Sequence, residues 1–276
     1  MSTSIESRPV WFERAGSRLF AIDKGHGLPV LFFHGGLADP RASLFHVGGL
    51  AAAHRVVMPD LRGSGRSIHA GDLSWDLLAD DAAALLDHLG IERAVVGGVS
   101  AGSAVALRFA LRHPARALGL LLKSPVYAGG DRQLTEAQRA AFRAMEALGR
   151  RVLEEGIDVL CPLYERLPEA IREAALEMMR GFDPASVAAT TRFLASAVQP
   201  FQTLSELGAI AAPALLVPGT DPEHPAEVCA LYARYLRRAT TADPSSAELL
   251  ERMEALCESC SEAAARQSRQ SPLEYQ

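Results

Sequence analysis

The chain has 276 residues, of which 49% are apolar and 22% charged, and its formal net charge is -5. This length suits one α/β unit that carries an insertion and buries a sizeable core. The basic residues form no run or stripe, which excludes nucleic-acid binding as the expected function. We expect a cytoplasmic protein, because the sequence shows no signal-peptide pattern, no apolar run of membrane-spanning length and four scattered cysteines.

Strand-like and helix-like segments alternate through the first half of the chain. Strands are predicted at residues 18–23, 30–33, 55–58, 94–96 and 118–122, and helices at residues 75–89 and 101–112. Such alternation predicts an α/β fold: a mostly parallel, doubly wound sheet with helices on both faces.

The pattern changes at residues 130–207. Phe142, Met145 and Leu148 follow helical spacing there, and the segment contains no strand-like run. Strand patterns return at residues 214–217 and, weakly, 239–242, with helices at residues 225–236 and from residue 246 onward. The sequence therefore predicts an all-helical insertion, residues 130–207, in a core made of residues 1–129 and 208–276.

Gly98-Val99-Ser100-Ala101-Gly102 lies between a predicted strand and a predicted helix. This segment matches the Gly-x-Ser-x-Gly nucleophile elbow, a sharp turn that exposes the serine and leaves no room for side chains beside it. We interpret Ser100 as a nucleophile, and the alternative is a serine in an ordinary glycine-rich turn.

His34, Gly35 and Gly36 follow another predicted strand. Glycines at this place let backbone N–H groups approach a developing oxyanion. The predicted donors are the amide of Leu37 or Gly36 and the amide of Ala101. We expect His34 to form structural hydrogen bonds in this turn rather than to act as a base.

The segment DLRGSGRS begins at Asp60, after a further predicted strand. We interpret it as a turn that is stabilised by an Asp–Arg pair.

Four segments, HGG, DLRGSGRS, GGVSAGSAVALRFALRHP and PGTDPEHP, together resemble the α/β-hydrolase superfamily in its compact ester-hydrolase-like branch. The resemblance covers nearly the whole chain and implies the α/β-hydrolase fold, with the predicted helical insertion in the place of the family's lid. It does not imply one reaction, because this fold hosts esterases, lactonases, C–C hydrolases, lyases and non-enzymatic proteins.

The resemblance places the acid of a catalytic triad at Asp221, and the alternative is a turn or helix-capping aspartate. The family's histidine follows the last strand, but this sequence has no histidine after His224. His224 lies three residues beyond Asp221 and either serves as the base or caps the helix that Pro225 begins. His34 and His46 are the other histidines that could turn toward the site.

Three further residues receive structural interpretations. Cys257 and Cys260 lack the additional ligands of a zinc site, so we expect them on the apolar face of a helix. Lys123 ends a strand and is expected to snorkel at the surface, with a substrate carboxylate as its alternative partner. No metal and no organic cofactor are expected.

These residues predict a serine-dependent hydrolase of a small, fairly apolar ester, thioester or lactone, working as a monomer or homodimer without a membrane partner. Ser100 would attack the carbonyl, His224 would move the proton, and Asp221 would orient His224. The missing C-terminal histidine leaves an alternative open: a protein of this fold that does not hydrolyse, such as a small-molecule binding protein, a lyase or a cyclase.

Overall fold

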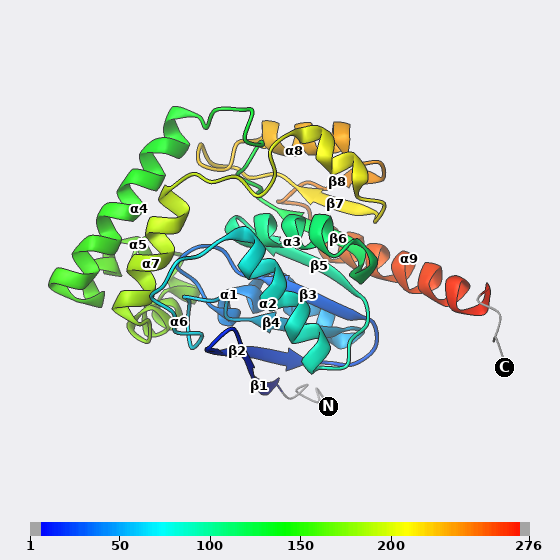
Figure 1. Ribbon diagram of the computed structural model, residues 1–276, viewed down its shortest axis with the longest axis horizontal. Helices are drawn as coiled ribbons and strands as arrows, with labels where there is room; N and C mark the ends of the chain where they lie inside the picture. Colours follow the sequence, from blue (N-terminus) through cyan, green and yellow to red (C-terminus); the bar gives the residue numbers. More distant parts are fainter. Residues whose placement is uncertain (1–6, 271–276) are drawn as a thin grey trace.

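An eight-stranded sheet forms the centre of residues 7–270, the part of the chain that the computed structural model describes (Figure 1). The strands are β1 (Ser7–Arg14), β2 (Ser17–Lys24), β3 (Pro29–Phe33), β4 (Arg55–Pro59), β5 (Ala94–Val99), β6 (Ala117–Lys123), β7 (Ala214–Val217) and β8 (Ala239–Thr241). The α-helices are α1 (Pro40–Val47), α2 (Trp75–His88), α3 (Ala101–Arg112), α4 (Glu136–Glu155), α5 (Cys161–Tyr164), α6 (Glu169–Arg180), α7 (Pro184–Ala195), α8 (Ala226–Tyr235) and α9 (Leu249–Gln270). Four 3₁₀ turns are η1 (Gly48–Ala52), η2 (Pro114–Arg116), η3 (Ile157–Leu160) and η4 (Leu204–Ala209).

The strand order across the sheet is β1-β2-β4-β3-β5-β6-β7-β8. β2 runs antiparallel to both β1 and β4, and all the pairs from β4 to β8 are parallel. The predicted mostly parallel sheet is therefore confirmed. Parallel strands end at the same edge of a sheet, so the loops after β3, β5 and β7 meet at its carboxyl edge.

Helices cover both faces of the sheet. Val105 of α3 and Tyr232 of α8 belong to the apolar cluster on one face. Cys257 and Cys260 of α9 belong to the cluster on the other face, where both thiols are free and at most 2% exposed. The doubly wound arrangement is confirmed, and the two cysteines lie on the apolar face of a helix as predicted.

Two elements, β1 and α1, have no counterpart in the sequence prediction. Only Val10 and Phe12 of β1 are buried, because this edge strand pairs on one side with β2 and exposes the rest of its side chains. The short helix α1 does carry a local signal: the Asp39 side chain accepts the Arg41 N–H at 2.7 Å, and Pro40 is its first residue.

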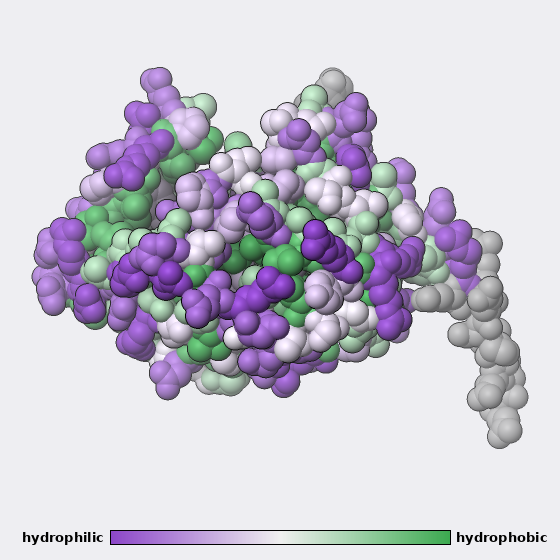
Figure 2. Space-filling model, turned by 90° about the horizontal axis from the view of Figure 1, so that it is seen from above, coloured by the Kyte–Doolittle hydropathy of each residue, from purple (hydrophilic) through white to green (hydrophobic). Residues whose placement is uncertain are grey.

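A helical insertion, α4 to α7, lies between β6 and β7 and is coloured green to yellow in Figure 1. Its own apolar cluster contains Val152, Met179 and Phe182. Gly149 allows α4 and α7 to approach closely, since an added Cβ would overlap Thr191 Oγ1. Figure 2 shows apolar side chains over this insertion, at the left of the view, and further apolar side chains in the middle of the same face. Within the described chain, no strand interrupts these helices.

Candidate active site

Ser100 occupies a strained turn between β5 and α3. Its backbone has φ 54° and ψ -118°, a combination that a residue with a side chain rarely adopts. An added Cβ at Gly98 would overlap the backbone of Gly102, and one at Gly102 would overlap the backbone that ends β3. The Ser100 N–H donates to the Lys123 carbonyl oxygen at 3.0 Å, which ties the turn to β6. The turn therefore holds a partly exposed serine at the carboxyl edge of the sheet.

The turn after β7 brings Asp221 and His224 to the same place. His224 Nε2 lies 2.9 Å from Ser100 Oγ, and His224 Nδ1 lies 2.8 and 3.0 Å from the two carboxylate oxygens of Asp221. The backbone N–H groups of Glu223 and His224 also donate to Asp221 Oδ1, at 3.0 and 2.9 Å. Gly219 makes this tight turn possible, because an added Cβ there would overlap the backbone and Cβ of His224. The three-residue span between Asp221 and His224 thus folds the imidazole back toward the elbow.

The hydrogen bonds of His224 define one arrangement of its protons. Burial alone would raise the pKa of Asp221, but the hydrogen bond and charge of His224 outweigh it, and the pKa falls below its usual value. Asp221 is therefore an acceptor at neutral pH, so Nδ1 carries the proton that His224 donates to it. This leaves Nε2 free to accept the Ser100 hydroxyl proton. The side chain of Asp221 is 52% exposed and that of His224 is 21% exposed, so solvent reaches the acid more than the base.

The loop after β3 lies against Ser100. A Cβ added to Gly35 would stand 3.5 Å from the Ser100 Cβ, and Gly36 and Ala101 line one cavity together. Leu37 has φ 52°, lines a neighbouring cavity, and accepts the Tyr164 hydroxyl at its carbonyl oxygen. Of the residues predicted to supply the oxyanion donors, Gly36 and Ala101 line one cavity and Leu37 lines the neighbouring one.

The His34 ring forms hydrogen bonds that stabilise the loop after β3. The ring is fully buried, with Nδ1 2.7 Å from the Gly35 carbonyl oxygen and Nε2 accepting the Leu61 N–H at 3.0 Å. Burial lowers its pKa, so the ring is neutral with Nδ1 as the donor. Both ring nitrogens are thus occupied by backbone groups, and His34 joins the loops after β3 and β4.

His46 and Lys123 lie close enough for the lysine charge to act on the imidazole. The His46 ring packs 6.3 Å from the Phe32 ring, and burial, with the Lys123 charge, lowers its pKa to about 4. Lys123 is half-buried at the end of β6, and burial lowers its pKa.

The segment that starts at Asp60 forms different contacts from those predicted. Asp60 is 2% exposed and accepts the backbone N–H of Arg66 at 2.7 Å. The Arg62 guanidinium instead donates to the carboxylate of Asp81 on α2, at 2.7 and 2.8 Å. The expected Asp–Arg pair within the turn was therefore wrong, because the buried guanidinium finds its charge partner on a neighbouring helix. Burial raises the pKa of Asp60 to about 7, and the Asp39 charge adds to this effect.

The cavity beside Ser100 is formed jointly by the core and the insertion. Its lining is almost entirely apolar and consists of Gly35, Gly36, Leu61, Arg62, Ser64, Leu73, Trp75, Leu78, Ala101, Val105, Thr190, Phe193 and Leu194. From α7, Leu194 approaches the same loop, with its Cδ1 3.0 Å from a Cβ added to Gly36. The cavity is small: its volume of about 20 Å³ holds about one water molecule.

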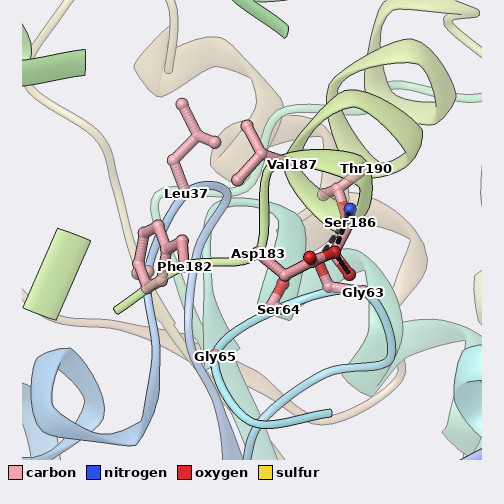
Figure 3. A pocket seen from close by; sticks show the side chains of 10 residues that line it. Leu37, Gly63, Ser64, Gly65, Phe182, Asp183, Ser186, Val187 and Thr190 are labelled. Carbon is pink, nitrogen blue, oxygen red and sulfur yellow. Dashed lines mark hydrogen bonds between the residues drawn. The ribbon is translucent and has the colours of Figure 1, made fainter. Parts of the chain in front are cut away.

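A second cavity lies along the seam between α7 and the turn after β4. Figure 3 shows Thr190 and Ser186 of α7 directed toward Gly63 and Asp183. Thr190 Oγ1 donates to the Gly63 carbonyl oxygen at 2.8 Å, and Ser186 Oγ donates to Asp183 Oδ1 at 2.7 Å. The bond from Thr190 to Gly63 ties the insertion to the core next to the first cavity, and the bond from Ser186 to Asp183 lies within the insertion.

Two residues that touch the site were not singled out from the sequence. Gln138 bonds the turn that carries His224, and Leu194 covers Gly36. The Thr135-x-x-Gln138 spacing is a recognisable capping box and could have marked the start of α4. No local pattern indicates a contact with a turn that follows 85 residues later.

Within residues 7–270, no group of three or more His, Cys, Asp or Glu side chains is arranged to hold a metal ion. In the same part of the chain, no helix is both long and apolar enough to cross a membrane.

Comparison with known proteins places the chain in a large family. A family model described as the alpha/beta hydrolase fold matches residues 29–168. The 2-hydroxymuconate semialdehyde hydrolase of Pseudomonas sp. (strain CF600) is 35% identical over 135 residues, 46% of each protein. The dihydrolipoyllysine-residue acetyltransferase component of the acetoin cleaving system of Pseudomonas putida is 33% identical over 189 residues, 62% of this chain and 48% of that protein. The matched part spans about half the length of these two relatives.

Solved structures match over almost their full length. A thermophilic esterase from Thermogutta terrifontis has a TM-score of 0.70 and 26% identity, covering 95% of this chain and 98% of the esterase. The enol-lactonase from Burkholderia xenovorans LB400 has a TM-score of 0.71 and 19% identity, covering 93% of this chain and 100% of that enzyme. The second likeness shows the fold.

The family match covers half of the chain, and the sheet order, the strained serine turn and the likeness to solved structures agree with it. The chain belongs to the α/β-hydrolase superfamily. The semialdehyde hydrolase and the esterase are hydrolases by name, which supports a hydrolase of that superfamily.

Proposed function

We propose that this protein is a serine hydrolase that cleaves a small, fairly apolar carboxylic ester, thioester or lactone. The observation that carries the proposal is the unbroken chain of contacts from Ser100 Oγ to His224 Nε2 and from His224 Nδ1 to Asp221. A serine hydroxyl is a weak nucleophile until an adjacent base accepts its proton, and a base needs a third group to hold its orientation.

The reaction would proceed in two acyl transfers. Ser100 Oγ attacks the carbonyl carbon while its proton passes to His224 Nε2, and Asp221 stabilises the imidazolium through Nδ1. The amides of Gly36 and Ala101 hold the oxyanion of the tetrahedral intermediate. His224 then gives its proton to the leaving alcohol or thiol, and the acyl group remains on Ser100. Water attacks the acyl-enzyme, passes a proton through His224 back to Ser100 Oγ, and releases the carboxylic acid.

The cavity supports the proposed substrate class. Its lining is mostly aliphatic and aromatic, which favours an acyl group without charge. The esterase from Thermogutta terrifontis is a relative with a name in keeping with this class. We propose residues 130–207 as a lid over a core of residues 1–129 and 208–276, since Met145 and Leu194 of the insertion lie within 4 Å of the place that a Cβ added to Gly36 would occupy. This chemistry needs no metal or organic cofactor.

A panel of chromogenic esters of increasing acyl length, with a fluorophosphonate probe, tests the proposal. We expect the probe to label Ser100, and Ser100→Ala to abolish turnover while leaving the thermal unfolding midpoint nearly unchanged. His224→Ala should lower the rate with a labile ester by about two orders of magnitude or more. His26, whose side chain is exposed, provides the matched control, and His26→Ala should keep the wild-type rate.

The opposite result would favour the non-hydrolytic alternative. An unlabelled Ser100 together with a panel of unreacted esters would indicate a binding protein, lyase or cyclase on this scaffold. The sequence supported that alternative through the missing C-terminal histidine, and the contact between His224 and Ser100 weighs against it.

A further inference from the structure

We infer that Gln138 is a positioning residue that holds His224 at its working distance from Ser100. The inference rests on the proposed function, because it gives His224 the role of the base. It assigns a part in catalysis to α4, the first helix of the insertion.

The side chain of Gln138 is buried and its hydrogen bonds fix its orientation. Gln138 is 3% exposed. Its amide nitrogen donates to the carbonyl oxygens of Val126 at 2.8 Å and Glu223 at 3.3 Å, and its Oε1 accepts the Thr135 N–H at 3.0 Å. Both amide hydrogens therefore meet acceptors and the amide oxygen meets a donor. A reversed amide would place its oxygen against the two carbonyl oxygens and its NH₂ group against the Thr135 N–H.

The Glu223 carbonyl belongs to the residue directly before His224. Asp221 and Glu223 of this turn are exposed, so few buried contacts restrain it. Gly219 approaches His224 from within the turn, and Gln138 reaches the same turn from α4. The hydrogen bond to the buried Val126 fixes the position of the Gln138 amide. This amide can therefore hold the backbone next to His224 in place relative to the core.

This contact also couples the insertion to the base. If the start of α4 moves outward to admit a substrate, the bond to Glu223 is released and His224 loses an anchor. When α4 returns, the bond forms again and the imidazole regains its position 2.9 Å from Ser100 Oγ.

Gln138→Ala and Thr135→Ala together test the inference. Thr135→Ala removes the hydroxyl that caps α4 by accepting the Gln138 backbone N–H at 3.2 Å, but it leaves all the side-chain bonds of Gln138 intact. We expect Gln138→Ala to lower kcat by about tenfold to a hundredfold with KM within about twofold, as for a misplaced reacting group. Thr135→Ala should keep kcat within about twofold of wild type at a temperature where both variants are folded.

Gln138→Glu provides a pH-dependent measurement that would not change with pH if Gln138 only stabilised the fold. Its second oxygen would repel the carbonyl oxygens of Val126 and Glu223 when ionised, and would donate to one of them when protonated. The ratio of its kcat/KM to that of the wild type should therefore rise as pH falls from about 8 to about 6. A ratio that does not change with pH, or a wild-type kcat for Gln138→Ala, would overturn the role of Gln138.

His224→Ala, measured in the same series, separates the two ideas. Wild-type activity in His224→Ala would defeat the proposed function itself. A large loss in His224→Ala with no loss in Gln138→Ala would defeat only the inference about Gln138.

Discussion

Replacing Gly219 with alanine should displace His224 from Ser100. An added Cβ at this position would lie at or inside 3.0 Å of the carbonyl oxygen, carbonyl carbon and Cβ of His224. These atoms belong to the backbone or its first side-chain atom and cannot swing aside, so the turn must open by about 1 Å. The distance from His224 Nε2 to Ser100 Oγ, 2.9 Å in the native turn, would then lie near the limit of a hydrogen bond or beyond it.

We expect the kcat/KM of Gly219→Ala for p-nitrophenyl acetate to fall by about a hundredfold, because a misplacement of about 1 Å at a reacting group costs that much. Gly208→Ala is the matched control, since the nearest atom to its added Cβ is the Tyr235 carbonyl oxygen at 3.8 Å. Thermal unfolding of both variants separates lost activity from lost fold. A Gly219→Ala protein within about threefold of wild type would refute the argument that the tightness of this turn sets the position of His224.

Two further variants test the buried carboxyl and the cavity. Burial raises the pKa of Asp60 to about 7, so the folded chain keeps a proton that the unfolded chain releases above its usual pKa of 3.8. The free energy of unfolding should therefore fall by roughly 3 kcal/mol as pH rises from about 4 to 7, and Asp60→Asn should flatten this dependence in urea titrations. If the free energy of unfolding depended on pH in the same way for Asp60→Asn and the wild type, Asp60 would not be the source of this dependence. Leu194→Ala should raise kcat/KM by about fourfold for each of the first methylenes added to the acyl chain, because burying each one contributes about 0.8 kcal/mol. An unchanged chain-length profile would show that Leu194 does not bound the acyl site.

Local patterns in the sequence determined the framework of this protein. The apolar runs of β3, β5 and β6 and the helical stripes of residues 130–207 predicted the parallel sheet and its insertion, since strand and helix periods are properties of neighbouring residues. The spacing of Gly98 and Gly102 around Ser100 predicted the strained turn for the same reason: each glycine is required by backbone atoms a few residues away or on the adjoining strand.

Tertiary structure decided which side chains meet. His224 lies 124 residues from Ser100 in the chain, and the sequence left it as either a base or a helix cap. Its contact with Ser100 depends on how the turn after β7 packs against the elbow. In the same way, Arg62 bonds to Asp81 rather than to the nearer Asp60, and Gln138 reaches Glu223. Such pairs are selected by the packing of whole elements, because a buried polar group must find a partner wherever the fold brings one within hydrogen-bond distance.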